Sequence, residues 1–148
     1  MRVLAATLAR GNAHRTKKMR EREQAPVPNK FQILIVEDDT VFRRGLARIF
    51  SADQFEVAQA SDGEQALALL GQRPLDLIIC DFRLPGINGM GVLNHAQQVR
   101  PRTPFLMLTA YYSEELLKEA TAQGAVAVLE KPIELKLLRE RCTEILQA

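Results

Sequence analysis

The sequence predicts an α/β protein built on a doubly wound, five-stranded parallel sheet. Five short apolar or β-branched runs of strand length occur from Phe31 onward. Each run is followed by an amphipathic segment of helix length, so the chain reads as five βα units. Parallel strands need crossover connections, and right-handed crossovers place helices on both faces of the sheet. We expect the strand order 2-1-3-4-5.

The five expected strands are rich in apolar residues, as is typical of strands covered on both faces. In chain order they are FQILIV, FEVAQA, LDLIIC, PFLMLT and AVAVLE, at residues 31–36, 55–60, 75–80, 104–109 and 125–130. The expected helices cover about residues 40–52, 62–72, 88–99, 113–123 and 133–147.

Cap residues support two of these helices. Ser61 or Asp62 can cap the second helix and Ser113 the fourth, because their side-chain oxygens accept hydrogen bonds from the free N–H groups of the first turn. Acidic residues follow in both first turns, where they suit the helix dipole. Gly124 supplies a left-handed stop for the fourth helix.

Length and composition indicate one globular domain outside the membrane. The 148 residues suffice for one full core and are too few for two. No apolar run approaches the ~18 residues that a membrane-spanning helix needs. Cys80 and Cys142 suggest neither a disulfide framework nor a metal site by number or spacing. We expect a cytoplasmic protein.

Residues 1–30 form a basic extension before a domain at 31–148. The extension carries eight basic and two acidic residues, whereas the remaining 118 residues carry 12 basic and 16 acidic ones. Pro26 and Pro28 favour an extended linker, and we expect the extension to be disordered. A targeting peptide, or contact with nucleic acid or acidic lipid, is an alternative. A start at Met19 would remove the first 18 residues.

Polar side chains follow four of the five expected strands. Glu37 and Asp38 follow the first strand, and Asp81 follows the third. Thr109 ends the fourth strand, and Lys131 follows the fifth. Ligands of doubly wound sheets bind beyond the carboxyl ends of the strands, where the strand order reverses. We therefore expect these side chains to meet at one edge of the sheet.

Glu37, Asp38 and Asp81 are expected to form a divalent metal site. The first and third strands would be neighbours about 4.8 Å apart, so the carboxylates would repel one another without a cation. Oxygen ligands without Cys or His favour Mg²⁺ over zinc. Together with Lys131 and Thr109, these residues could hold a phosphoryl group while negative charge develops on its oxygens. Taken singly, each residue also fits a plain role such as a helix cap or a surface lysine.

Five motifs resemble those of a known family. They are ILIVEDD, ASDGEQAL, DLIICDFRLPGINGMGVL, LMLTA and GAVAVLEKPI, in this order. They resemble the successive signatures of the response-regulator receiver domain of two-component signalling, from about Lys30 to the C-terminus. The resemblance implies a flavodoxin-like fold and a phosphoacceptor function in a two-component system or phosphorelay.

The resemblance implies a role for each residue at the acidic edge. Asp81 would accept the phosphoryl group from a phosphohistidine of a sensor histidine kinase or a histidine phosphotransfer protein. Thr109 would be the switch hydroxyl that moves toward the phosphoryl group, and Lys131 would contact that group. Pro132 matches a proline that the family holds in a cis peptide.

The resemblance also implies a ligand set for Mg²⁺ or Mn²⁺. Glu37 and Asp38 match the acidic pair that holds the ion, with Asp38 the more direct ligand. Asp81 adds its carboxylate, and the backbone carbonyl of Arg83 matches a further protein ligand.

Three positions depart from the family pattern or vary within it. Val128 stands where the family often has a Tyr or Phe that couples to the switch hydroxyl, and Tyr111 or Tyr112 would be a substitute. Arg83 and Tyr111 lie at variable positions beside the phosphoryl site. Their bulk is expected to shield an acyl phosphate from water and to slow self-dephosphorylation.

The resemblance implies a signalling protein that catalyses only its own aspartyl phosphorylation and dephosphorylation. Because the sequence stops at Ala148, just after the last expected helix, we expect a stand-alone receiver. It would signal by conformational change to an unknown downstream protein. We expect a monomer or a phosphorylation-dependent dimer, with no membrane insertion and no nucleic-acid partner.

Three alternatives stay open. An aspartyl phosphatase or an acidic-metal nuclease is one, although such phosphatases generally have a second Asp where this chain has Arg83. A degenerate receiver that acts as a phosphorylation-independent interaction module is another, and Val128 keeps it open. Regulated nucleic-acid binding through the basic tail is the third, and the absence of interleaved aromatic residues makes its support weak.

Overall fold

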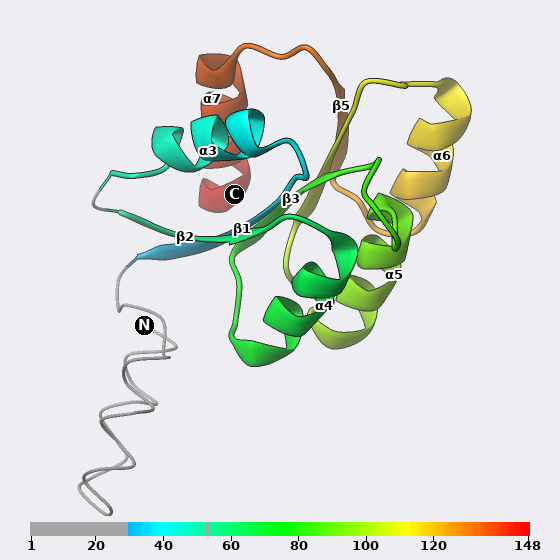
Figure 1. The fold of residues 1–148 in the computed structure, drawn as a ribbon, viewed down its shortest axis with the longest axis horizontal. Helices are drawn as coiled ribbons and strands as arrows, with labels where there is room; N and C mark the ends of the chain where they lie inside the picture. The colour runs from blue at the N-terminus through cyan, green and yellow to red at the C-terminus, as the bar shows by residue number, and fades with distance from the viewer. Residues whose placement is uncertain (1–29, 53) are drawn as a thin grey trace, which may run out of the picture.

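A computed structural model describes residues 30–52 and 54–148 as a parallel sheet with helices on both faces (Figure 1). The sheet has the order β2-β1-β3-β4-β5, as the sequence predicts. Its strands are β1 (Phe31–Val36), β2 (Phe55–Ala60), β3 (Leu77–Asp81), β4 (Phe105–Thr109) and β5 (Ala127–Glu130). The helices are α3 (Thr40–Ile49), α4 (Gly63–Gln72), α5 (Gly89–Val99), α6 (Glu114–Ala122) and α7 (Leu135–Gln147). The sequence predicts disorder for residues 1–30. All of these residues except Lys30 lie outside the described part of the chain.

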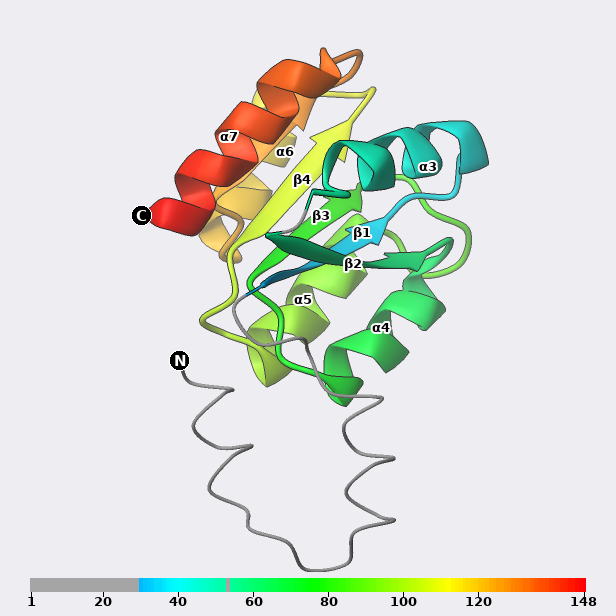
Figure 2. The same ribbon diagram turned by 90° about the vertical axis from the view of Figure 1, so that its left-hand side faces the viewer.

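Two hydrophobic cores fill the space between the sheet and its helices. Helices α3 and α7 cover one face, and α4, α5 and α6 cover the other, as the two ribbon views show (Figure 2). Successive strand residues point to opposite faces, so each central strand supplies both cores. Within β3, for example, Ile79 belongs to the α3/α7 core and its neighbours Ile78 and Cys80 to the other core. This two-sided burial explains the near-continuous apolar runs of the sequence.

Most element bounds agree with the sequence to within one residue, and four differ by two or three. The fifth strand begins at Ala127 rather than 125. The first helix ends at Ile49 rather than near residue 52, because Phe50 leaves helical geometry and buries its ring completely. The third strand begins at Leu77 rather than 75 and includes Asp81, the residue at the edge of interest. The last helix begins at Leu135 rather than 133, with Glu134 as its N-cap.

Side-chain caps fix the starts of four helices. Asp39, Asp62, Asn88 and Ser113 each accept at least one hydrogen bond from a first-turn backbone N–H of α3, α4, α5 and α6. Asp62, rather than Ser61, caps α4, and Ser113 caps α6 as the sequence predicts. These polar starts lie at the carboxyl end of the sheet, because each helix follows a strand directly.

Gly89 lets the start of α5 approach the end of β3. A Cβ atom at this position would lie 2.6 Å from the carbonyl oxygen of Asp81 and 2.7 Å from the Cα of Phe82. Both are backbone atoms, which cannot swing away as a side chain would. The N–H of Gly89 also donates to the carbonyl of Phe82 at 2.7 Å, so the loop after Asp81 closes tightly on the helix.

Replacing Gly89 with Ala is expected to lower the free energy of unfolding by about 1–3 kcal/mol through overpacking. Gly71→Ala is the matched control, because a Cβ there meets nothing within 4 Å and the residue lies in α4. The control is expected to stabilise the protein by up to about 1 kcal/mol through helix propensity. Urea unfolding followed by circular dichroism measures both, and equal stability of Gly89→Ala and the wild type would contradict the argument.

Candidate functional site

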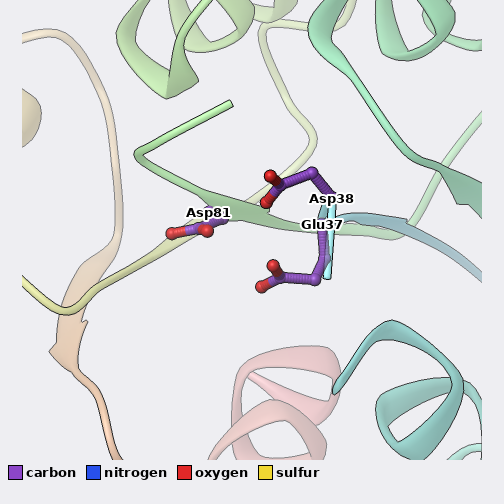
Figure 3. Close-up of side chains that lie close together, drawn as sticks. All are labelled: Glu37, Asp38 and Asp81. Carbon is purple, nitrogen blue, oxygen red and sulfur yellow. The ribbon is translucent and has the colours of Figure 1, made fainter. Parts of the chain in front are cut away.

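The acidic residues meet because β1 and β3 are paired neighbours. Val36 is in register with Cys80, so Glu37 and Asp81, the residues that follow, come out side by side. Carboxylate oxygens of Glu37, Asp38 and Asp81 all lie within 4.8 Å of one another. Figure 3 shows the three side chains gathered around one space beyond the ends of the two strands.

The three carboxylates differ in exposure. Glu37 is 1% exposed and Asp81 is 7% exposed, whereas Asp38 is open to solvent. All five residues of β3, including Asp81, are buried, so the packing of the strand holds Asp81 in place. The arrangement combines two sheltered carboxylates with one that faces water.

Lys131 lies between the two buried carboxylates. Its ammonium is 2.7 Å from Oε1 of Glu37 and 3.2 Å from Oδ2 of Asp81. The backbone N–H of Lys131 donates to the carbonyl of Thr109 at 2.7 Å, which fixes the lysine at the end of β5 next to β4. Lys131 therefore meets Glu37 and Asp81 at one edge of the sheet, as expected for these side chains.

Burial and charge shift the ionisation of this group. Burial raises the pKa of Glu37 above its ordinary value, although the hydrogen bond from Lys131 opposes the shift. Burial alone would lower the pKa of Lys131, but its hydrogen bond to Glu37 and the charge of Asp81 outweigh burial and raise the pKa. The lysine is thus held as a cation, next to a Glu37 carboxylate whose charged form is disfavoured by burial.

The donor set fits a hard divalent cation and does not fit a thiolate site. Carboxylate oxygens from Glu37, Asp38 and Asp81 are of the kind that Mg²⁺ and Mn²⁺ prefer. Cys80 is fully buried, and burial followed by the nearby charges of Asp81 and Glu37 raises the pKa of its thiol well above the usual range. Cys142 has its pKa raised to about 12 by burial, and both cysteines are free.

The structure also places the other residues singled out in the sequence. Thr109 is fully buried, and its hydroxyl accepts a hydrogen bond from the N–H of Tyr111 at 2.9 Å. The Arg83 guanidinium lies 4.1 Å from the centre of the Tyr111 ring. Val128 is buried in β5, and the Lys131–Pro132 peptide is cis, as expected.

Three residues at the site were missed by the sequence reasoning. The N–H of Asp39 donates to Oε2 of Glu37 at 3.1 Å, and the Arg43 guanidinium donates to the Glu37 carbonyl at 2.9 Å. The ring of Phe42 lies 4.6 Å from the Lys131 ammonium. Asp39 belongs to the recognised acidic run, but the positions of Phe42 and Arg43 have no signal in the sequence pattern.

No helix in the described part of the chain combines the length and the apolar character needed to cross a membrane.

Known proteins resemble this chain in sequence and in fold. The regulator of RpoS of Escherichia coli K12 is 41% identical over 110 residues, which is 74% of this chain and 33% of the relative. A CheY-like receiver domain protein of Methanospirillum hungatei has a solved structure that is 30% identical, with a TM-score of 0.76 over 80% of this chain and 94% of that one. This chain spans about a quarter to a third of the length of the curated relatives it matches.

A further solved structure of similar fold is of a phosphorylated protein. A response regulator of Burkholderia pseudomallei, 25% identical with a TM-score of 0.69 over 80% of this chain and 75% of that one, was solved with a phosphorylated aspartic acid and a calcium ion. The family model described as the response regulator receiver domain matches residues 33–143. The chain therefore belongs to the response regulator receiver domain family.

Proposed function

We propose that Asp81 is the residue that accepts the phosphoryl group. The observation that carries the proposal is its position: a carboxylate at the end of a fully buried strand, 3.2 Å from the Lys131 ammonium and grouped with two further carboxylates. An oxygen of Asp81 forms the new P–O bond while the P–N bond to a phosphohistidine breaks, and that electron pair remains with the imidazole nitrogen. The donor is a sensor histidine kinase or a histidine phosphotransfer protein.

Glu37, Asp38 and Asp81 would hold Mg²⁺ or Mn²⁺, together with the backbone carbonyl of Arg83. When bound, the ion would neutralise negative charge between the carboxylates and the phosphoryl oxygens. Both oxygens of Glu37 already accept hydrogen bonds, from Lys131 and from the N–H of Asp39. The exposed Asp38 is therefore the carboxylate with more freedom to bind an ion directly, in line with the sequence expectation.

Lys131 and Thr109 would hold the transferred group. The lysine is already at Asp81, where a cation stabilises charge on the phosphoryl oxygens. The Thr109 hydroxyl faces the Tyr111 N–H in this structure, so reaching the phosphoryl group requires that hydrogen bond to break. Because Val128 leaves the usual aromatic position without a ring, we propose that Tyr111 transmits the change instead. The Tyr111 side chain is 60% exposed and so is available to a downstream protein.

The family favours phosphoacceptor signalling over the alternatives of an enzyme and a nucleic-acid binder. The aspartyl phosphatase remains disfavoured by Arg83, whose exposed side chain packs on Tyr111 and carries no carboxylate for a second proton transfer. A degenerate receiver would lack part of the acidic centre, yet Glu37, Asp38, Asp81 and Lys131 are all brought together.

The phosphoacceptor assignment is tested by intact mass after incubation with acetyl phosphate and Mg²⁺. The wild type is expected to gain about 80 Da, the mass of one phosphoryl group, and Asp81→Asn to gain nothing. Asp62→Asn is the matched control, because it removes another strand-end carboxylate while Asn can still cap α4. An unmodified wild type would favour the phosphorylation-independent interaction module.

Metal affinity is expected to fall as the pH drops through the raised pKa of Glu37. Protonated Glu37 cannot attract a cation, so its contribution is present above that pKa and is lost below it, starting above the ordinary glutamate value of about 4.3. Glu37→Gln has no such proton and is expected to bind Mg²⁺ roughly tenfold more weakly near neutral pH, with a flatter pH dependence. Calorimetric titration measures both, and identical pH dependence of the two proteins would contradict the role of Glu37.

Loss of phosphate is expected to be faster in the double variant Arg83→Ala, Tyr111→Ala. We expect the stacked guanidinium and ring to shield the phosphoryl site from water, so their removal should speed hydrolysis roughly three- to tenfold. The backbone carbonyl of Arg83 is kept in this variant. Arg102→Ala removes an exposed arginine from the opposite end of β4 and serves as control. Decay is followed by intact mass after acetyl phosphate is removed, and an unchanged rate would disprove the shielding.

A further inference from the structure

Phe42 covers the ammonium of Lys131. The nitrogen lies 4.6 Å from the centre of the aromatic ring, within the ~6 Å range of a cation–π interaction. Phe42 lies in the first turn of α3, on a different element from the carboxylates that bind the same ammonium. The lysine therefore has an aromatic face on one side and two carboxylate oxygens, from Glu37 and Asp81, as its other partners.

The backbone around Phe42 is tied to the acidic centre. Asp39 caps α3 by accepting hydrogen bonds from the N–H groups of Val41 at 2.9 Å and Phe42 at 3.2 Å. The N–H of Asp39 in turn donates to one oxygen of Glu37, and the other oxygen of Glu37 accepts from Lys131. Hydrogen bonds therefore connect Lys131 to Glu37, Glu37 to Asp39, and Asp39 to the backbone of Phe42. The ring of Phe42 in turn contacts Lys131.

An aromatic face is a suitable neighbour for an ammonium that must also bind a phosphoryl group. Lysine carries its charge on a flexible four-carbon stem, so its position depends on its partners. The ring attracts the cation through its quadrupole but is a much weaker acceptor than a carboxylate or phosphoryl oxygen. Phe42 can thus restrain Lys131 without competing for the N–H groups that face Asp81.

We propose that Phe42 is a positioning residue for phosphoryl transfer, whose ring keeps the Lys131 ammonium beside Asp81. The inference rests on the proposed function, because it assumes that Asp81 receives the phosphoryl group. The inference also goes beyond the proposed function, because the motifs that carry the family resemblance assign no role to Phe42. The half-buried ring packs against the α3/α7 core as well, so the test must separate positioning from packing.

Three variants separate the two roles. Phe42→Leu keeps an apolar side chain but removes the aromatic face, and Phe42→Tyr restores it. Phe31→Leu is the packing control: Phe31 is also half-buried, packs against the same core, and lies at the other end of β1 from Glu37. Urea unfolding of each variant shows how much packing each exchange costs.

The direct readout is the proton chemical shift of the Lys131 ε-methylene group in the unphosphorylated protein. Protons above an aromatic face are shifted upfield, so the upfield shift is expected in the wild type and Phe42→Tyr and absent in Phe42→Leu. The rate of phosphorylation by acetyl phosphate with Mg²⁺ is expected to fall roughly two- to fivefold in Phe42→Leu, the loss expected for one partly exposed cation–π contact. Phe42→Tyr and Phe31→Leu are expected to react at the wild-type rate.

Several results would overturn the proposal. A Lys131 shift that survives in Phe42→Leu would show that the ring does not cover the ammonium. A phosphorylation rate in Phe42→Leu that is unchanged or higher, or that falls equally in Phe31→Leu, would exclude positioning. If the wild type accepts no phosphoryl group, the proposed function fails. The chemical shift would still report separately whether Phe42 holds the lysine.

Discussion

The ammonium of Lys131 lies 2.7 Å from one buried carboxylate and 3.2 Å from another, and the site depends on this contact. Glu37 and Asp81 are forced together by the pairing of β1 with β3, and burial raises the pKa of Glu37, whereas the hydrogen bond from the lysine opposes this shift. The lysine supplies its cation from the end of β5. Both hydrophobic cores contribute to this site, because they hold in place the strands whose carboxyl ends carry these charges.

Much of the fold was predictable because it follows from local patterns. Strands covered on both faces read as apolar runs, and the helices between them show amphipathic spacing and capping residues such as Ser113. The convergence of Glu37, Asp38, Asp81 and Lys131 was also predictable, because parallel strands bring their carboxyl ends to one edge. Element bounds were less accurate where tertiary packing decides them, as at the buried ring of Phe50.

The rest of the site depends on side-chain directions that no periodicity encodes. The stacking of Arg83 on Tyr111 and of Lys131 under Phe42 requires particular rotamers on separate elements. The direction of the Thr109 hydroxyl, toward the N–H of Tyr111, likewise reflects the local path of the chain after β4. Such contacts depend on how separate elements are placed in three dimensions. The local sequence pattern alone is therefore compatible with other side-chain contacts.

The span of chain between Glu37 and Lys131 has a consequence for biosynthesis. The two residues are 94 positions apart, and contacts across such distances form late because closing a long loop costs entropy. As the chain leaves the ribosome, Glu37 and Asp81 emerge well before their counterion. Because Lys131 follows β5, the acidic edge gains this cationic partner only when the last strand of the sheet is in place.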